Sequence, residues 1–307
     1  MKRSFKMLII SFLLIFSISS LLVGCSTYTS GSNTGTEILE ANNAIKFADD
    51  KDVVFVDMQS RETYDKTHMN GAVNIVLADI VDSTTIPNML PAKETIEKVL
   101  GNAGIKNDMT IIVYDDNNNM DAARFWWTMK VYGHEKVKVV SGGIKALKAA
   151  GANLNADKPV KFAETYTAKD ANKSMIATME DVRNQVNNPD KNVVLLDTRT
   201  QQEYDAGTIP SSILINYIDN NYADGRYKSI QDIKMMYLDK KIKPDNTVIM
   251  YCKTSVRGAE TYLALYNAGF RNLKLYDGAW SQWSADSSNP VQTPSGNGVK
   301  PGKSDNS

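Results

Sequence analysis

A cysteine between a strand pattern and a helix pattern is the first candidate for chemistry in this sequence. Residues 247–258 read Thr-Val-Ile-Met-Tyr-Cys-Lys-Thr-Ser-Val-Arg-Gly, with apolar strand formers before Cys252. Residues 259–269 then repeat apolar side chains at helical spacing. A thiol at such a junction lies where backbone N–H groups of the loop and the helix N-terminus converge. That positive field, together with Lys253 and Arg257, favours the nucleophilic thiolate.

Four residues separate Cys252 from Arg257, and this spacing distinguishes between two chemistries. Phosphatases that use a cysteine nucleophile carry five residues between these positions. The shorter loop resembles the active-site loop of the rhodaneses, which are sulfurtransferases. A structural cysteine at a strand end is the alternative, and the two cations beside Cys252 argue against it.

Composition limits the classes of function. The chain has 307 residues, enough for two domains, and 42% apolar residues, enough for a sizeable core. Its formal net charge is zero, so nothing indicates a nucleic-acid partner. Two cysteines and two histidines argue against a zinc site.

The N-terminus has the pattern of a targeting segment. Three basic residues precede an uncharged apolar run over residues 7–23, and Leu22-Val23-Gly24-Cys25 matches the bacterial lipobox. A transmembrane anchor is the alternative, since a run of this length reaches the lower limit for spanning. We expect a lipoprotein signal peptide over residues 1–24 and lipidation of Cys25. The protein would then be extracytoplasmic and lipid-anchored to the bacterial cell membrane, and Cys252 would be its one free thiol.

The rest of the chain repeats itself. Val193–Asp197 repeats the strand pattern of Val53–Asp57, and Tyr251-Cys252 aligns with Tyr114-Asp115. Strands that alternate with helices predict parallel sheets covered on both faces. We therefore expect one duplicated domain rather than a single very long sheet. The expected segments are a flexible tether (25–36), a first domain (37–156), a linker (157–173), a second domain (174–284) and a disordered tail (285–307).

Within these domains the apolar patterns predict individual elements. A helical pattern begins at Glu37, and a second helix is expected over residues 122–132. Short buried strands are expected at residues 53–57, 111–114, 137–140, 193–197 and 248–251.

Several motifs together resemble the tandem rhodanese domains of thiosulfate and 3-mercaptopyruvate sulfurtransferases. The resemblance covers roughly residues 37–284 and implies an α/β fold of two rhodanese-like domains, each a parallel sheet flanked by helices. The motifs that carry it are Tyr114-Asp115-Asp116, Asp121 to Trp127, Tyr132-Gly133-His134, Asp197-Thr198-Arg199, Tyr251-Cys252 and Tyr276 to Trp283.

The two copies differ at the positions that carry the chemistry. Asp115 stands where the second copy has Cys252, and Gln59 stands where it has Arg199. A carboxylate cannot carry a sulfane sulfur, so the resemblance implies an inactive first domain and a catalytic second domain. Cys252 would be the nucleophile, and the residues expected to bind substrate are Arg199, Lys253, Thr254, Ser255, Val256 and Arg257.

Two of these assignments have alternatives. Arg199 could instead be a surface arginine paired with Glu203. Ser255 replaces a glycine that is frequent in the family, so it either strains a loop that needs positive φ or places its hydroxyl near the sulfur. Asp57 and Asp197 are expected to hold the loops that follow their strands by accepting backbone N–H bonds.

The resemblance implies a sulfurtransferase that needs no metal or organic cofactor. It would move a sulfane sulfur from thiosulfate or 3-mercaptopyruvate to cyanide or a thiol through a Cys252 persulfide. Its partners would be a small anionic sulfur donor, a thiol or cyanide acceptor, and the membrane through the lipid anchor. The alternatives are a sulfur-relay or redox-sensing module with little free turnover, a phosphatase, and a binding protein that keeps the fold alone.

Overall fold

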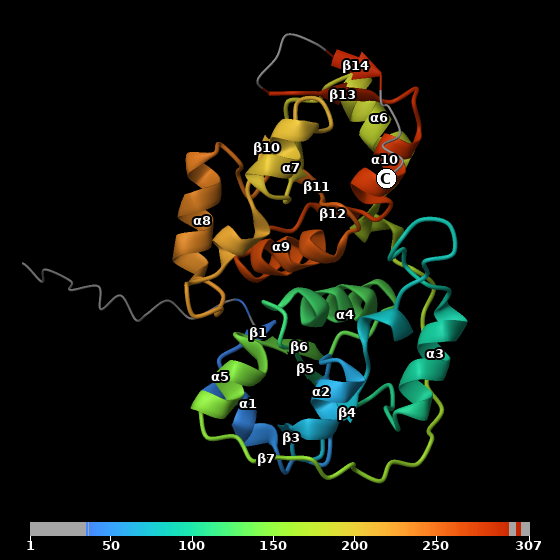
Figure 1. Cartoon of the computed structure of the whole chain (residues 1–307), viewed down its shortest axis with the longest axis vertical. Helices are drawn as coiled ribbons and strands as arrows, with labels where there is room; N and C mark the ends of the chain where they lie inside the picture. Colours follow the sequence, from blue (N-terminus) through green and yellow to red (C-terminus); the bar gives the residue numbers. More distant parts are fainter. Residues whose placement is uncertain (1–34, 36, 295–298, 302–307) are drawn as a thin grey trace, which may run out of the picture. The chain divides into compact units, whose positions relative to one another are not determined.

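The computed structural model describes residues 35, 37–294 and 299–301, and these lie in one compact unit (Figure 1). The predicted signal peptide, the predicted lipid site at Cys25 and nearly all of the predicted tether lie outside the described residues. Within the described ranges, no helix has both the length and the apolar character needed to cross a membrane.

Two five-stranded sheets share one strand order, and every neighbouring pair of strands in them is parallel. Across the first sheet the strands are β1 (Ile38–Leu39), β6 (Val137–Val140), β5 (Thr110–Tyr114), β2 (Val53–Asp57) and β4 (Val73–Asn74). Across the second sheet they are β8 (Ile176–Ala177), β12 (Leu273–Tyr276), β11 (Thr247–Tyr251), β9 (Val193–Asp197) and β10 (Ile213–Leu214). The shared order confirms the predicted duplication and the α/β fold.

Five helices accompany each sheet. Those of the first domain are α1 (Ala41–Ala44), α2 (Arg61–Lys66), α3 (Lys93–Asn102), α4 (Met120–Val131) and α5 (Gly143–Ala149). Those of the second domain are α6 (Met179–Asn187), α7 (Gln201–Ala206), α8 (Ile230–Asp239), α9 (Val256–Asn267) and α10 (Ala279–Ala285).

Smaller elements complete the fold. Short 3-10 helices span η1 (Ile45–Phe47), η2 (Leu77–Asp79), η3 (Lys173–Met175) and η4 (Tyr217–Asn220). Two antiparallel pairs join β3 (His68–Met69) to β7 (Leu154–Asn155) and β13 (Pro290–Gln292) to β14 (Val299–Pro301).

The core follows from alternation along the strands. In β2, Val54 and Val56 join the buried cluster that includes α3 and α4, whereas Phe55 joins the cluster on the opposite face with α1 and α5. The first of these clusters continues into the second domain, where α9 packs on α4 (Figure 1). Trp126 of α4 lies 5.4 Å from Tyr266 of α9, measured between ring centroids. One apolar cluster therefore spans both domains, and each domain has a further cluster of its own.

The chain near residue 37 differs from its predicted helix. Ile38 and Leu39 form strand β1 and pair with Val139 and Val140 of β6, and only the short helix α1 follows. Pairing with the open edge of the first sheet satisfies backbone groups and buries part of both apolar side chains. Helical spacing of a few apolar residues does not exclude this arrangement.

The structured part of the second domain extends beyond residue 284. Asn289 is buried, the indole N–H of Trp283 donates to the Pro290 carbonyl at 3.0 Å, and β13 exchanges backbone hydrogen bonds with Thr208. Between the domains, residues 156–172 form no helix or strand.

Candidate active site

Cys252 lies directly after β11 and is almost fully buried, with 1% of its surface exposed. Its side chain is a free thiol. The loop then turns at Ser255, which has a φ of +67° and lies directly before the first residue of α9. Helix α9 begins at Val256, three residues before the predicted start. The strand–loop–helix junction expected from the sequence is thus present, with the helix N-terminus close behind the sulfur-bearing residue.

Ser255 adopts the positive φ that favours glycine, and its hydroxyl is used within the loop. The Oγ atom donates to the carbonyls of Tyr276 at 2.9 Å and Asp277 at 2.5 Å. These bonds fasten the loop to the segment between β12 and α10. The hydroxyl is therefore bonded to backbone carbonyls. The positive φ is the one considered from the sequence as a source of strain in the loop, and a position of the hydroxyl near the sulfur stays a prediction.

Arg257, in the first turn of α9, is bonded to a carboxylate. Its Nη1 and Nη2 atoms donate to the two carboxylate oxygens of Glu203 at 2.7 and 2.8 Å. The bond to Glu203 is the main reason that the pKa of Arg257 is raised; burial acts against this rise, and the nearby Cys252 side chain adds to it. Burial alone would raise the pKa of Glu203, but the bonds from Arg257 and Thr200 hold it at about 2.

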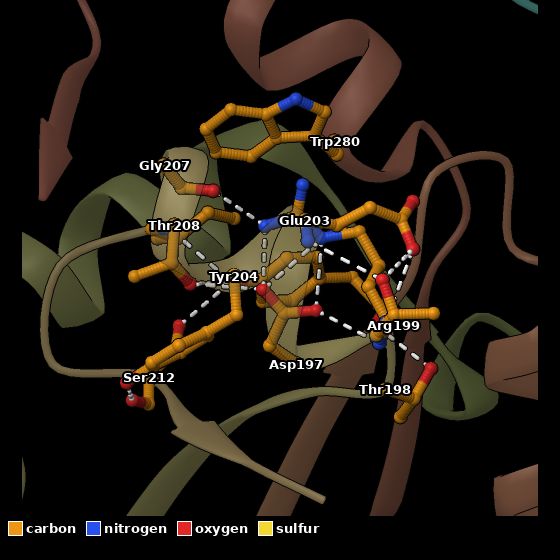
Figure 2. Close-up of polar contacts among 12 residues, drawn as sticks. Asp197, Thr198, Arg199, Glu203, Tyr204, Gly207, Thr208, Ser212 and Trp280 are labelled. Carbon is orange, nitrogen blue, oxygen red and sulfur yellow. Dashed lines mark hydrogen bonds and ion pairs between the residues drawn. The ribbon is translucent and has the colours of Figure 1, made fainter. Parts of the chain in front are cut away.

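Arg199 is buried and bonds within a network around Asp197 (Figure 2). Its Nε and Nη2 atoms donate to the carboxylate of Asp197, with the shortest contact at 2.6 Å, and Nη2 also donates to the Gly207 carbonyl at 2.6 Å. The indole of Trp280 covers the guanidinium at 4.3 Å. Arg199 therefore pairs with Asp197, not with Glu203 as in the alternative considered from the sequence.

The first domain repeats this network without the arginine. Gln59 donates through Nε2 to the Asp57 carboxylate at 2.8 Å and to the Thr67 carbonyl at 3.1 Å. Asp57 also accepts the backbone N–H of Gln59, as Asp197 accepts that of Arg199. The predicted loop-holding role of the two aspartates is confirmed, and Gln59 makes the equivalent loop contacts.

Asp115 shows what the loop of the first domain can bind. Its carboxylate accepts four backbone N–H bonds of 3.0–3.1 Å, from Asn117, Asn119, Asp121 and Ala122. Burial raises the pKa of Asp115 to about 7, and the backbone N–H groups act against that rise. In this fold the loop between strand and helix therefore directs several backbone N–H groups at the oxygens of one side chain, an arrangement that can also bind an anion.

The other predicted substrate-binding residues lie along the Cys252 loop. Lys253 is exposed, Thr254 is half-buried and Val256 is buried at the start of α9. Sequence reasoning did not find Asn88 of the first domain, whose Nδ2 donates to the Thr254 hydroxyl at 3.0 Å. It also did not assign a role to Glu203 at Arg257, which a search for acidic partners of the loop cations could have proposed.

Comparisons with known proteins agree with this architecture. The chain matches the Rhodanese-like domain family over residues 40–150 and 178–286. A protein of Saccharopolyspora erythraea, named provisionally as a thiosulfate sulfurtransferase, is 30% identical over 265 residues, which are 80% of this chain and 92% of that protein.

Two solved structures share the fold. SseA from Escherichia coli, described as a 3-mercaptopyruvate sulfotransferase, has a TM-score of 0.71 at 24% identity, over 80% of this chain and 98% of SseA. The anaerobic ergothioneine biosynthesis enzyme of Chlorobium limicola has a TM-score of 0.71 at 21% identity over 78% of this chain. This chain spans about 64% of the length of that enzyme. With two matched copies of the domain and a relative at 30% identity, the chain belongs to the rhodanese-like domain family and is an enzyme of the sulfurtransferase type.

Proposed function

We propose that this enzyme moves a sulfane sulfur from a small anionic donor to a nucleophilic acceptor through a persulfide on Cys252. The observation that carries the proposal is the position of Cys252, which lies buried between β11 and α9, with Arg257 in the first turn of that helix. Helix α9 spans twelve residues, and its aligned peptide dipoles and free N-terminal N–H groups produce a positive field at the loop.

The reaction needs two displacements. The Cys252 thiolate attacks the outer sulfur of thiosulfate, a sulfur–sulfur bond forms, and sulfite leaves with the electron pair of the broken bond. The persulfide anion is then bound by loop N–H groups, as the first-domain loop binds the Asp115 carboxylate. Cyanide or a thiolate attacks the terminal sulfur, and Cys252 is released as the thiolate.

The charge around the loop bears on the choice of donor. Glu203 compensates Arg257 and Asp197 compensates Arg199, while Lys253 is exposed. Lys253 and the Cys252 side of Arg257 support binding of thiosulfate, and 3-mercaptopyruvate is the second donor to test. A substrate contact by Arg199 stays a prediction, with its Nε and Nη2 atoms already bound by Asp197 and Gly207.

The experiment uses the full-length chain with Cys25→Ala, in which Cys252 is the one remaining cysteine. Its intact mass is measured before and after thiosulfate and again after cyanide. A gain of one sulfur atom that cyanide removes supports the proposal, and Cys252→Ser should show no gain. A gain from 3-mercaptopyruvate alone assigns that donor. No gain from either donor overturns the proposed transfer and favours a binding or redox-sensing module, whereas a persulfide that forms but passes little sulfur to cyanide favours a sulfur-relay module.

We also propose that the chain is exported and lipid-anchored through Cys25. The support is the basic N-terminus, the apolar run and the lipobox Leu22-Val23-Gly24-Cys25. Cells that express the protein are labelled with radioactive palmitate and then fractionated. The native chain should carry the label in the membrane fraction, and Cys25→Ala should carry none. Equal labelling of both chains would contradict the anchor.

A further inference from the structure

The loop that follows η2 in the first domain reaches the catalytic loop of the second. Asp82 and Met89 close this loop by exchanging backbone hydrogen bonds of 2.8 Å, and Asn88 lies just before its end with φ of +61°. From this position the Asn88 amide donates through Nδ2 to the hydroxyl oxygen of Thr254 at 3.0 Å. Thr254 is two residues beyond Cys252.

The Asn88 backbone is held by Arg124 of the first domain, which also bonds to the second domain. Its carbonyl accepts the Nη2 N–H of Arg124 at 2.8 Å, and Arg124 is fully buried. The Nη1 atom of Arg124 donates to Asp277 at 2.9 Å, and the Asp277 carboxylate also accepts the Leu90 N–H at 2.6 Å. Because the Asp277 carbonyl accepts the Ser255 hydroxyl, two consecutive residues of the catalytic loop are fixed by contacts that lead to the first domain.

A hydroxyl group has one hydrogen to donate and two lone pairs to accept with. Since the Asn88 amide donates to Thr254, it occupies a lone pair and leaves the hydroxyl hydrogen for another acceptor. During the proposed reaction the hydrogen-bond acceptors whose negative charge changes at the Cys252 loop are the sulfur of Cys252 and the group that leaves the donor. A hydrogen bond from a hydroxyl to such an anionic group is stronger, and stabilises its acceptor more, than one to a neutral acceptor.

The first-domain loop that carries Asp115 also contacts the opposite domain, but this loop has no cysteine. Asn119, also at positive φ, donates through Nδ2 to the side chain of Asn221 and to the carbonyl of Gly225, both at 2.8 Å. Each domain thus contacts the nucleophile-position loop of the other. Only the contact through Asn88 bears on a loop that carries a thiol.

We infer that Asn88 is a positioning residue for the proposed sulfur transfer, acting through the hydroxyl of Thr254. The first domain then contributes to the rate of the reaction, although its loop carries no cysteine. This inference rests on the proposed function, and it assigns the role to one side-chain contact. Asn88→Gly removes that contact and tolerates the positive φ.

The test compares variants in the full-length Cys25→Ala chain. The rate of sulfur gain at Cys252 from thiosulfate and from 3-mercaptopyruvate, and the rate of Cys252 alkylation by iodoacetamide, are measured for each. Asn88→Gly should slow both rates about fivefold to tenfold, the value of one hydrogen bond. Asn88→Asp should slow them at least as much, because a carboxylate can only accept the Thr254 hydrogen. Asn119→Gly is the matched control and should leave both rates unchanged.

A double-variant cycle separates positioning from general destabilisation. In a Thr254→Val background the hydroxyl is gone, so Asn88→Gly should have no further effect on either rate. Thr254→Ser keeps the hydroxyl and should keep the effect. Rates for Asn88→Gly equal to those of the parent chain, or an undiminished effect in Thr254→Val, would overturn the inference. A parent chain that alkylates but gains no sulfur would instead count against the proposed function, while the alkylation rates still decide the role of Asn88.

Discussion

At the residue scale, Arg257 lies near Cys252 in the first turn of α9 and donates two hydrogen bonds to Glu203. Arg257→Gln removes the positive charge beside Cys252, so persulfide formation should slow by about 100-fold, as for other groups that stabilise a reacting anion. Arg257→Lys keeps the charge but loses the two-pronged bond to Glu203, so its loss should be about tenfold. Single-turnover mass measurements with thiosulfate give both rates.

The control for these variants is Arg271→Gln. Arg271 donates to the carbonyl of Tyr266, at the opposite end of α9 from Cys252. Its removal should leave the persulfide rate unchanged. If the Arg257→Gln chain reacts as fast as the Arg271→Gln chain, Arg257 does not stabilise the reacting anion.

The residue scale also shows where sequence reasoning stops. The loop around Cys252 was predictable because its residues are adjacent in sequence. The suggested pairing of Arg199 with Glu203 was wrong because Arg199 precedes the N-cap Thr200 and is not on helix α7. Its side chain turns back to Asp197 instead. The contact of Asn88 with Thr254 spans 166 positions and depends on a loop shape that no local pattern contains.

Ser255 offers a test of local strain against local bonding. Ser255→Ala keeps the unfavourable φ of +67° and leaves two buried carbonyls without their hydroxyl donor, so it should lower the free energy of unfolding by about 1–3 kcal/mol. Ser255→Gly loses the same bonds but relieves about 1 kcal/mol of strain, so it should be the more stable of the two. Urea unfolding measures both. An alanine variant more stable than the glycine variant would contradict the role of the positive φ.

At the scale of elements, the long buried strands were the most predictable part of the fold. Residues 53–57 and 193–197 form strands β2 and β9 with the predicted limits, because their apolar residues are buried on both faces of a parallel sheet. The edge strand β1 was not predicted, because two residues carry no periodicity and the pairing partner β6 is a hundred positions away. Sheet edges depend on tertiary contacts more than central strands do.

The junction between β6 and α5 depends on a glycine. A Cβ atom at Gly143 would lie 2.0 Å from the carbonyl oxygen of Asp115, and φ is +56°. Gly143→Ala should therefore destabilise the protein by about 2–4 kcal/mol, through the backbone clash and the positive φ together. Thermal and urea unfolding measure the loss.

Gly151→Ala separates the two causes. Gly151 has φ of +82°, but nothing lies within 4 Å of a Cβ atom there. Its substitution should cost only about 1 kcal/mol, the conformational part. Equal losses for the two variants would show that the approach of Asp115 to α5 is not what requires Gly143.

At the scale of the whole molecule, a buried ion pair joins the domains. Arg124 and Asp277 are 2.9 Å apart and almost fully buried. Arg124→Met leaves the Asp277 carboxylate buried without its cation, so it should lower the free energy of unfolding by about 3–5 kcal/mol. Adding Asp277→Asn removes that charge and should recover much of the loss. Lys66→Met, which breaks an exposed pair with Glu62, should cost less than about 1 kcal/mol. No recovery in the double variant would contradict this account.

Two buried carboxyl groups near the domain interface contribute to the pH dependence of the free energy of unfolding. Burial raises the pKa of Glu260 to about 8, against the opposing bonds from Asn220 and Asn221, and burial raises the pKa of Asp115 to about 7. Both values exceed those of an unfolded chain, near 4. Between pH 4 and pH 7–8 the unfolded chain has lost these protons while the folded protein keeps them, so stability falls as the pH rises.

The free energy of unfolding can fall by about 1.4 kcal/mol per pH unit for each of these two carboxyl groups. The fall should end above about pH 8, where both groups are ionised in the folded and the unfolded protein. Glu260→Gln removes one of the two protons from this balance, so its unfolding free energy should change less between pH 5.5 and 8.5 than that of the parent chain. Glu62→Gln, at an exposed glutamate of α2, should keep the parent slope. Urea unfolding at three pH values decides, and a Glu260→Gln slope equal to the parent's would show that Glu260 is ionised in the folded protein at neutral pH. In that case Asn220 and Asn221 would bind a Glu260 carboxylate across the whole pH range, and Asp115 would link proton uptake to folding without Glu260.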